Sequence, residues 1–363
     1  MDISVVVLFV VGLILLVAGA ELLVRSSAKL AHRIGISPLV VGLTIVALGT
    51  SSPELAVSLQ AGLAGQGDIA LGNVVGSNIF NILVILGISA ILAPLTVSQQ
   101  LVRLEVPIMI AVSMLLLVMA LDGRLSALDG LILFLGIIGY TAFAIIKSRN
   151  ETGDVVSEYE REFGSDSSRA QLLSEKVPVQ IALIVVGLIM LVAGSNWLVD
   201  GAVVFAQLLG ISELIIGLTI IAAGTSLPEV ATSIIAALRG EKDIAVGNVV
   251  GSNIFNILCI LGITSIFTPG GLAVSDAALF FNIPVMIAVA IACLPIFAYR
   301  HLISRWNGAL FLSFYVAYVI YLIFAAMQHA ILPTYTNAML GFVLPITAVT
   351  LIVLMIRSKE ARA

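Results

Sequence analysis

The chain is dominated by apolar runs that are each long enough to cross a lipid bilayer. A hydrocarbon core of about 30 Å is crossed by about 20 residues of α-helix. Only 10% of the residues are charged, and the runs lack the period-two alternation of a membrane β-barrel. We therefore predict an all-α polytopic membrane protein with eleven spans, near residues 3–24, 38–64, 70–93, 104–121, 127–147, 177–199, 212–237, 245–267, 279–298, 308–328 and 337–356.

The basic residues predict how these spans are oriented, because loops rich in Lys and Arg remain on the cytoplasmic side. With the N-terminus outside, 16 of the 17 Lys and Arg residues fall in cytoplasmic segments, and only Arg124 falls outside. The eleventh span then returns the C-terminus to the cytoplasm.

The sequence contains an internal duplication. Residues 68–83 match residues 243–258 at 15 of 16 positions, and Gly-Thr-Ser-Ser-Pro-Glu at 49–54 matches Gly-Thr-Ser-Leu-Pro-Glu at 224–229. The duplicated unit covers five spans, which predicts two repeats in a ten-helix core and leaves the last span outside it. The predicted parts are the first repeat at 1–147, an acidic cytoplasmic linker at 148–176, the second repeat at 177–328, and the eleventh helix with its tail at 329–363.

Because the unit has an odd number of spans, its second copy has to enter the membrane upside down. Matching loops carry opposite charge patterns: residues 25–33 hold three basic residues, whereas residues 200–211 hold none. Conversely, Arg239 and Lys242 have no basic counterparts in the first copy. Inverted repeats of this kind are typical of secondary transporters, whose substrate sites lie near the membrane midplane.

Two glutamates, Glu54 and Glu229, lie deep inside the second and seventh predicted spans. A carboxylate at the bilayer centre costs about 2.5–3.5 kcal/mol even on the lenient insertion scale. An ion pair would reduce this cost, but the second, third, seventh and eighth spans have no basic residue in their cores. The carboxylates must therefore be protonated, hydrated or neutralised by a bound cation.

The residues before each glutamate favour a bound cation. Pro53 has no N–H for the carbonyl of Gly49, so that oxygen is expected to be free one turn from Glu54. Thr50 and Ser51 stand four and three residues before Glu54, so their hydroxyls are predicted to share its face. The second copy repeats this arrangement with Gly224, Thr225, Ser226, Pro228 and Glu229.

The third and eighth spans supply further oxygen atoms. Ser77 and Asn81 share one helical face, as do Ser252 and Asn256. Glycines four residues apart, at 72 and 76 and at 247 and 251, predict close helix contacts. The remaining amides are open to roles as ligands, caps or interhelical contacts; they are Asn73, Asn78, Asn248 and Asn253.

The predicted site is built from oxygen atoms alone. It contains no His, and the two cysteines of the chain, Cys259 and Cys293, lie in apolar runs outside it. Anionic sites with many oxygen ligands suit hard cations such as Ca²⁺ and Na⁺ rather than Zn²⁺ or Cu⁺. The residues by themselves thus predict a transporter of hard cations.

At these two motifs the chain resembles the cation/Ca²⁺ exchanger superfamily, in particular its prokaryotic sodium/calcium exchanger-like branch. The resemblance rests on Gly-Thr-Ser-x-Pro-Glu and Gly-Asn-x-x-Gly-Ser-Asn-Ile-x-Asn, both present in each repeat. It implies that spans one and six slide across the other eight core helices. It also implies a Ca²⁺ site of Glu54 and Glu229 with the carbonyls of Thr50 and Thr225, flanking Na⁺ ligands at Ala47, Ser51, Ser77, Ala222, Ser226 and Ser252, and a central site lined by Asn81 and Asn256.

Two features depart from that family pattern. Some relatives, K⁺-dependent members among them, carry Asp where this chain has Asn256, so K⁺ coupling is not expected here. The eleventh span has no place in the ten-helix core.

The resulting hypothesis is an antiporter that exchanges Ca²⁺ for Na⁺ by alternating access. The alternatives are H⁺-coupled exchange of Ca²⁺ or another divalent cation, and a passive cation channel. An enzyme is not supported, since no nucleotide motif, nucleophile–base pair or zinc triad is found. We expect Ca²⁺ and Na⁺ as substrates, the lipid bilayer of a prokaryotic cytoplasmic (inner) membrane as surroundings, no cofactor and no obligate protein partner. The net charge of −4 without a basic arm also argues against nucleic acid as a partner.

Overall fold

The computed structural model of the protein describes residues 3–163, 177–208 and 222–360, and these residues are almost entirely helical. Residues 164–176 of the predicted linker and 212–221 of the predicted seventh span lie outside this described part. The first repeat contains α1 (Ile3–Ile34), α2 (Pro38–Val41), η1 (Gly42–Val46), α3 (Ala47–Thr50), α4 (Ser52–Leu63), α5 (Gly67–Phe80), η2 (Asn81–Leu86), α6 (Gly87–Leu92), β1 (Leu95–Thr96), η3 (Leu101–Glu105), α7 (Val106–Met119), η4 (Ala120–Asp122), β2 (Arg124–Leu125) and α8 (Ala127–Phe163).

The described part of the second repeat follows the same order of elements, except that no counterpart of η4 stands between α16 and β4. It contains α10 (Val177–Leu208), α12 (Ala222–Gly224), α13 (Leu227–Leu238), α14 (Lys242–Phe255), η6 (Asn256–Leu261), α15 (Gly262–Phe267), β3 (Leu272–Ala273), η7 (Ala278–Asn282), α16 (Ile283–Ala298), β4 (Leu302–Ile303) and α17 (Arg305–Ala326). The chain then continues through α18 (Leu332–Ala338), η8 (Met339–Val343) and α19 (Leu344–Glu360).

The predicted fold class is confirmed. Nine helices of the described part are long and apolar enough to cross a membrane, and a tenth span is formed if Pro38–Thr50 and Ser52–Leu63, bent by 47°, are counted together. The seventh predicted span is represented by α12 and α13. One detail differs from the sequence prediction, because α8 continues through Phe163 and makes the first part of the predicted linker helical.

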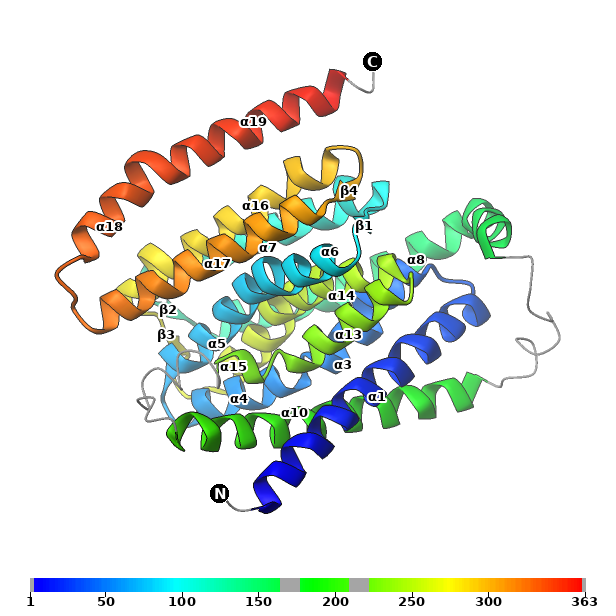
Figure 1. Cartoon of the computed structure of the whole chain (residues 1–363), viewed down its shortest axis with the longest axis horizontal. Helices are drawn as coiled ribbons and strands as arrows, with labels where there is room; N and C mark the ends of the chain where they lie inside the picture. Colours follow the sequence, from blue (N-terminus) through cyan, green and yellow to red (C-terminus); the bar gives the residue numbers. More distant parts are fainter. Residues whose placement is uncertain (1–2, 164–176, 209–221, 361–363) are drawn as a thin grey trace.

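Two short antiparallel ladders show the inversion of the second repeat. β1 precedes α7 as β3 precedes α16, and β2 follows α7 as β4 follows α16. Nevertheless β1 pairs with β4, and β2 pairs with β3. Equivalent loops therefore lie at opposite ends of the molecule, and each ladder joins one loop of each repeat (Figure 1).

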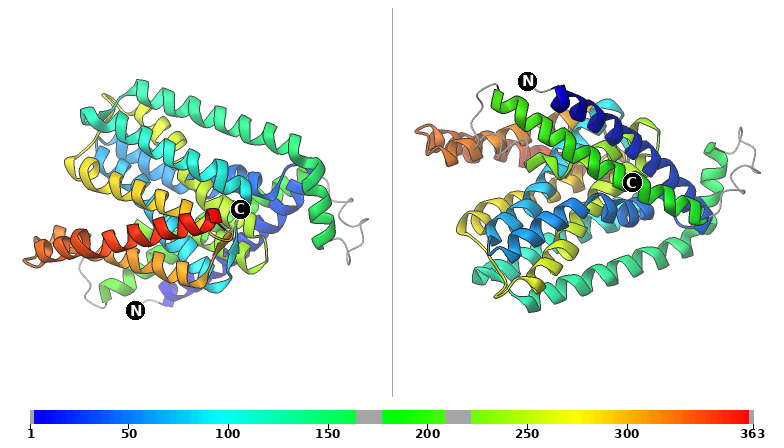
Figure 2. Two further views of the ribbon diagram at one scale, coloured as in Figure 1. Left: turned by 90° about the horizontal axis from the view of Figure 1, so that it is seen from above. Right: turned by 90° about the horizontal axis from the view of Figure 1, so that it is seen from below.

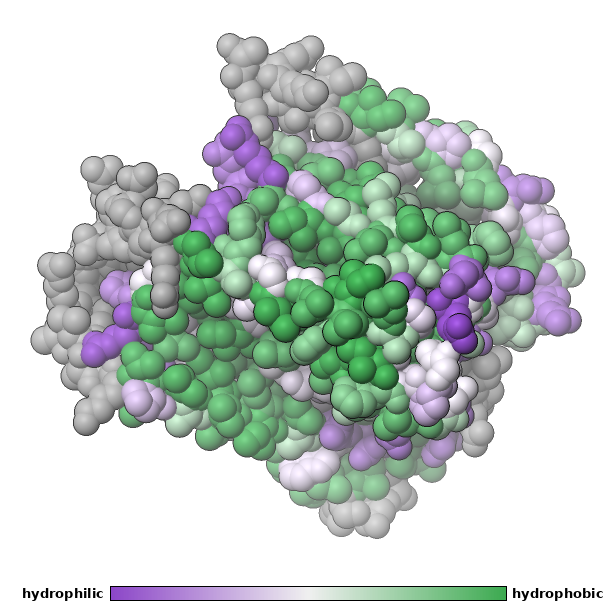
Figure 3. Space-filling view, turned by 180° about the vertical axis from the view of Figure 1, so that it is seen from behind, coloured by the Kyte–Doolittle hydropathy of each residue, from purple (hydrophilic) through white to green (hydrophobic). Residues whose placement is uncertain are grey.

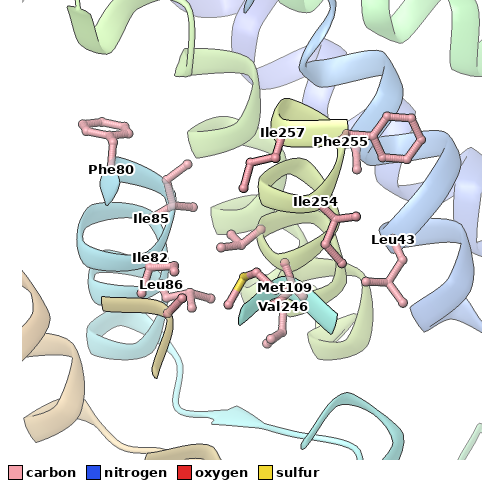
Figure 4. Packing of buried hydrophobic residues seen from close by; sticks show 14 of the residues in the cluster. Leu43, Phe80, Ile82, Ile85, Leu86, Met109, Val246, Ile254, Phe255 and Ile257 are labelled. Carbon is pink, nitrogen blue, oxygen red and sulfur yellow. The ribbon is translucent and has the colours of Figure 1, made fainter. Parts of the chain in front are cut away.

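The two repeats meet at α5–η2–α6 and α14–η6–α15, which are the most deeply buried spans. Apolar side chains from both repeats form this core, among them Ile82 and Ile85 of η2 and Ile254 of α14 (Figure 4). Helices α17, α18 and α19 lie at the periphery (Figures 1 and 2), and few of their described side chains are buried. Apolar side chains also cover much of the outer surface, as expected for a lipid-facing wall (Figure 3).

Helices α1 and α10 lie side by side and cross the rest of the bundle along one side (Figures 1 and 2). Four glycines at equivalent positions of the two repeats bring their backbones together. A Cβ added to Gly12 would lie 2.9 Å from the carbonyl oxygen of Gly194, and one added to Gly19 would lie 2.8 Å from that of Gly187. This close approach of two backbones at glycines resembles the small-residue contacts of membrane helices.

The predicted glycine contact is also found on α14. A Cβ at Gly247 would lie 2.9 Å from the carbonyl oxygen of Leu39, and one at Gly251 would lie 2.6 Å from that of Leu43. The matching partners of Gly72 and Gly76 would be residues 214 and 218, which lie outside the described part of the chain.

We expect Gly251→Ala to destabilise the folded protein by about 1–3 kcal/mol, because the new methyl group meets backbone that cannot rotate away. The matched control is Gly139→Ala in α8, where no described atom lies within 4 Å of the added Cβ. The measurement is the thermal unfolding midpoint of each purified variant in detergent. Equal midpoints would contradict the close packing of α14 against η1.

Candidate cation-binding site

Each repeat contributes a broken helix to the centre of the molecule. Helix α3 ends at Thr50 and α4 begins at Ser52, with Pro53 in its first turn, while α12 ends at Gly224 and α13 carries Pro228 in its first turn. The residues at the two breaks have nearly the same backbone angles, with φ −81° and ψ 8° at Ser51 and φ −86° and ψ 5° at Ser226. The proline-induced break predicted from the sequence is therefore present in both repeats.

The breaks place both glutamates in the first turn of a helix, where the positive end of the helix dipole favours a negative charge. Glu54 and Glu229 are each only 1% exposed. Neither forms an ion pair with a Lys or Arg among the described residues. The carboxylates thus lack the basic partner that would make them purely structural.

Each carboxylate accepts a hydrogen bond from a serine of the other repeat. The Ser226 hydroxyl donates to Oε1 of Glu54 over 2.9 Å, and the Ser51 hydroxyl donates to Oε1 of Glu229 over 2.8 Å. The hydroxyl that the sequence predicts on the same face as Glu54 thus bonds the carboxylate of the opposite repeat.

Two further serines join these pairs from α5 and α14. The hydroxyl oxygens of Ser77 and Ser226 lie 3.2 Å apart, and the Ser252 hydroxyl lies 3.5 Å from Oε1 of Glu229. All four serines are buried. The structure thus brings the two glutamates and the four predicted serines into two connected clusters related by the internal symmetry.

Several buried oxygen atoms of this region have no hydrogen-bond partner among the described residues. They are Oε2 of Glu54, Oε2 of Glu229, Oδ1 of Asn81, Oδ1 of Asn256 and Oγ1 of Thr225. Leaving a buried acceptor unpaired costs about 1–3 kcal/mol, and more when it is charged. Two carboxylate and two amide oxygens, one of each from either repeat, are therefore available to a ligand that carries positive charge.

The other predicted residues lie at the same breaks. The Thr50 hydroxyl lies 3.2 Å from Oδ1 of Asn248 and 3.4 Å from the carbonyl oxygen of Ala47, which also accepts the Ser51 N–H over 3.0 Å. Thr225 lies within the second break, and Ala222 is the first residue of α12.

The free carbonyl predicted at Gly224 is occupied. The Ser195 hydroxyl of α10 donates to it over 2.8 Å, so a side chain replaces the N–H that Pro228 lacks. A role for Ser195 is not among the predictions from the sequence. A comparison of the two repeats could have indicated one, because the matching residue of the first repeat is Ala20, which has no hydroxyl. This hydrogen bond connects α10 directly to the break.

The four asparagines left open by the sequence all form interhelical contacts. Nδ2 of Asn73 donates to the Ser58 hydroxyl over 2.9 Å, and Nδ2 of Asn248 donates to the Ser233 hydroxyl over the same distance. Asn78 and Asn253 bond to each other's backbone carbonyls across the repeats. These amides hold α5 and α14 to the broken helices and to each other.

The chemistry of the region is that of a hard-cation site. Its available atoms are carboxylate, amide, hydroxyl and carbonyl oxygens, which are the ligands that Ca²⁺ and Na⁺ prefer. No group of three or more His, Cys, Asp or Glu side chains suited to a metal ion occurs in the described part of the chain. Among the oxygens described above, the anionic ones are those of Glu54 and Glu229.

We expect Ser51→Ala and Ser226→Ala each to weaken Ca²⁺ binding, because each removes the hydrogen bond that orients a carboxylate. A hydrogen bond to a charged group contributes about 1.5–3 kcal/mol, which corresponds to an affinity loss of about 10- to 100-fold. Ser113→Ala is the matched control, since that buried hydroxyl donates only to the Met109 carbonyl of its own helix. Isothermal titration of the purified variants with CaCl₂ measures the effect, and unchanged affinity in both would refute the assigned orientation.

The chain is similar to a known protein family over most of its length. The model of the family described as sodium/calcium exchanger protein matches residues 4–146 and 179–324. The sodium/calcium exchanger MaX1 of Methanosarcina acetivorans is 35% identical over 347 residues, which cover 87% of this chain and 98% of that protein. The inner membrane protein YrbG of Escherichia coli K12 is 39% identical over 292 residues, which cover 79% of this chain and 87% of that protein.

A solved structure of the sodium-calcium exchanger NCX_Mj is also similar. The two structures align with a TM-score of 0.74 and 32% sequence identity, over 89% of this chain and 100% of the other. The family match covers parts of both repeats and ends before α18. This multi-pass membrane protein therefore belongs to the sodium/calcium exchanger family, whose members are transporters and not enzymes.

Proposed function

We propose that the protein is a secondary active antiporter that exchanges Ca²⁺ for Na⁺ at the site between its two repeats. The observation that carries this proposal is the pair of buried carboxylates, Glu54 and Glu229, whose Oε2 atoms have no partner among the described residues. Two negative charges balance one Ca²⁺. Family membership and the similarity to proteins named sodium/calcium exchangers support the same function.

The proposed Ca²⁺ ligands are the carboxylates of Glu54 and Glu229 and the carbonyls of Thr50 and Thr225. The proposed Na⁺ sites flank them and use oxygens of Ala47, Ser51, Ser77, Ala222, Ser226 and Ser252. Asn81 and Asn256 line the centre. Because Ser51 and Ser226 of the Na⁺ sites contact the carboxylates of the Ca²⁺ site, Na⁺ and Ca²⁺ compete in this proposal, and competition of this kind couples their transport.

Alternating access is assigned to α1 and α10. These two helices pack closely on each other through glycines and lie along one side of the bundle, so they can move as a pair across the buried core. If three Na⁺ ions exchange for one Ca²⁺, each cycle moves one net charge, worth about 2.3 kcal/mol per 100 mV.

The proposed orientation follows from the basic residues. The N-terminus lies outside, and the linker at 148–176 and the C-terminus lie in the cytoplasm of a prokaryotic cell, with the repeats at 1–147 and 177–328 spanning its inner membrane. This arrangement places the β1–β4 ladder on the cytoplasmic side and the β2–β3 ladder outside.

Coupling to protons is the second candidate, because protons on the two carboxylates would also neutralise their buried charges. The test is uptake of labelled Ca²⁺ into Na⁺-loaded proteoliposomes, diluted into Na⁺-free or Na⁺-equal buffer, with an imposed pH gradient as the comparison. Uptake driven only by the outward Na⁺ gradient supports the proposal. Uptake that ignores Na⁺ and follows the pH gradient would replace it with H⁺-coupled exchange, and uptake that needs neither gradient would indicate a channel.

We expect Glu54→Gln and Glu229→Gln each to abolish Ca²⁺ uptake, since either change removes half of the charge that balances Ca²⁺. Glu105→Gln is the matched control. Glu105 is also buried but accepts hydrogen bonds from Tyr140 and Gln100, and the second repeat has an amide, Asn282, at the matching position next to Tyr318. Near-normal flux in either Glu54→Gln or Glu229→Gln would refute the shared site.

Ser77→Ala and Ser252→Ala should weaken the dependence on Na⁺ more than the binding of Ca²⁺, because each removes a neutral oxygen from a flanking site. The measurement is the Na⁺ concentration that halves Ca²⁺ binding, together with the Ca²⁺ affinity in the absence of Na⁺. Ser113→Ala again serves as the control. A change confined to Ca²⁺ affinity would contradict this assignment of the two serines.

A further inference from the structure

We propose that Asn78 and Asn253 are positioning residues that force Asn81 and Asn256 to present their oxygen atoms, and not their amide N–H groups, to the transported cation. This inference rests on the proposed function and deepens it. Neither Asn78 nor Asn253 is assigned as a ligand. They act through the two amides that line the centre of the site.

The four asparagines form a closed arrangement across the internal symmetry axis. Nδ2 of Asn78 donates to the backbone carbonyl of Asn253 over 3.2 Å, and Nδ2 of Asn253 donates to the backbone carbonyl of Asn78 over 3.2 Å. Nδ2 of Asn256 then donates to Oδ1 of Asn78 over 3.0 Å, and Nδ2 of Asn81 donates to Oδ1 of Asn253 over 3.0 Å.

The two backbone carbonyls determine which end of each asparagine amide donates and which accepts, because a carbonyl oxygen can only accept a hydrogen bond. The Asn78 side chain faces the Asn253 carbonyl, so its NH₂ group must point towards that oxygen. The Asn78 Oδ1 then points the other way and can only accept from Asn256. The Oδ1 of Asn256 is left on the side away from Asn78, and the same reasoning holds for Asn253 and Asn81.

The second N–H of each positioning amide strengthens this conclusion. Nδ2 of Asn78 also lies 3.4 Å from Sδ of Met286, and Nδ2 of Asn253 lies 3.6 Å from Sδ of Met109. A flipped Asn78 would therefore place its oxygen against a carbonyl oxygen and a sulfur. All four asparagines are only 1–2% exposed, so bulk solvent cannot supply hydrogen bonds that would stabilise the flipped form.

The oxygens that result are those left without partners. Oδ1 of Asn81 and Oδ1 of Asn256 are both buried and unpaired among the described residues, like the Oε2 atoms of the two glutamates. Asn81 lies one helical turn after Ser77. The Ser77 hydroxyl contacts the Ser226 hydroxyl, which in turn donates to the carboxylate of Glu54. Both amides also begin π-helical segments, η2 and η6, which occur frequently at functional sites.

The test compares Ca²⁺ binding by the purified wild-type protein, Asn78→Ala and Asn253→Ala, measured by isothermal titration with CaCl₂. Without Asn78, the Asn256 amide can turn its N–H groups towards the cation, so we expect affinity to fall about 10- to 100-fold, as for other residues that orient metal ligands. Asn253→Ala tests the mirror-image contact to Asn81 independently. Met286→Leu is the matched control, since it removes a neighbour of Asn78 without changing the direction of the amides.

A double-mutant cycle separates this positioning role from a merely structural one. If Asn78 acts only through Asn256, then adding Asn78→Ala to Asn256→Ala should cost no further affinity, whereas an independent packing defect would add its full effect. Thermal midpoints of all variants accompany the titrations. Failure of the wild-type protein to bind Ca²⁺ would overturn the proposed function itself. Normal wild-type binding with undiminished affinity in Asn78→Ala or Asn253→Ala, or additive effects in the cycle, would overturn the positioning role alone.

Discussion

The structure depends on two carboxylates that are buried in a membrane-spanning bundle without a basic partner. Burying one such charge costs several kcal/mol, so the surroundings of Glu54 and Glu229 have to supply compensation. Helix N-termini and serine hydroxyls supply part of it, and in the proposed function a bound cation supplies the rest. The break in each helix creates such an N-terminus, and Pro53 and Pro228 stand directly before the two glutamates in its first turn.

The inverted duplication makes each half of the site incomplete by itself. Ser226 of the second repeat donates a hydrogen bond to Glu54 of the first, and Ser51 of the first repeat donates one to Glu229 of the second. The ladders β1–β4 and β2–β3 repeat this crossed pattern at the two ends of the molecule. A site assembled from both repeats about an axis in the membrane plane has nearly equivalent routes to either side, and alternating access needs such equivalence.

The molecule has a centre joined by side-chain hydrogen bonds and an outer layer formed by α1 and α10. In the centre, reciprocal amide hydrogen bonds join α5 to α14 and fix how the four asparagine amides are turned. On the outside, α1 and α10 pack on each other through glycine backbone contacts and through the edge-to-face rings of Phe9 and Phe205. The Ser195 hydroxyl is one polar contact between these layers, and it meets the carbonyl that Pro228 leaves without a donor.

The membrane-spanning class, the inverted duplication and the two buried glutamates with their prolines are all predictable from the amino-acid sequence. Hydropathy, loop charge and local helix breaking depend on residues close together in the chain. The sequence does not predict which serine donates to which carboxylate or that Ser195 donates to the Gly224 carbonyl. It also does not predict how the four asparagine amides are turned. Residues 51 and 229, or 78 and 256, are far apart in sequence, and their contacts arise only when the two repeats pack. The directions of hydroxyls and amides were therefore decided by the tertiary structure, since a hydrogen bond has a direction only once both of its partners are in place.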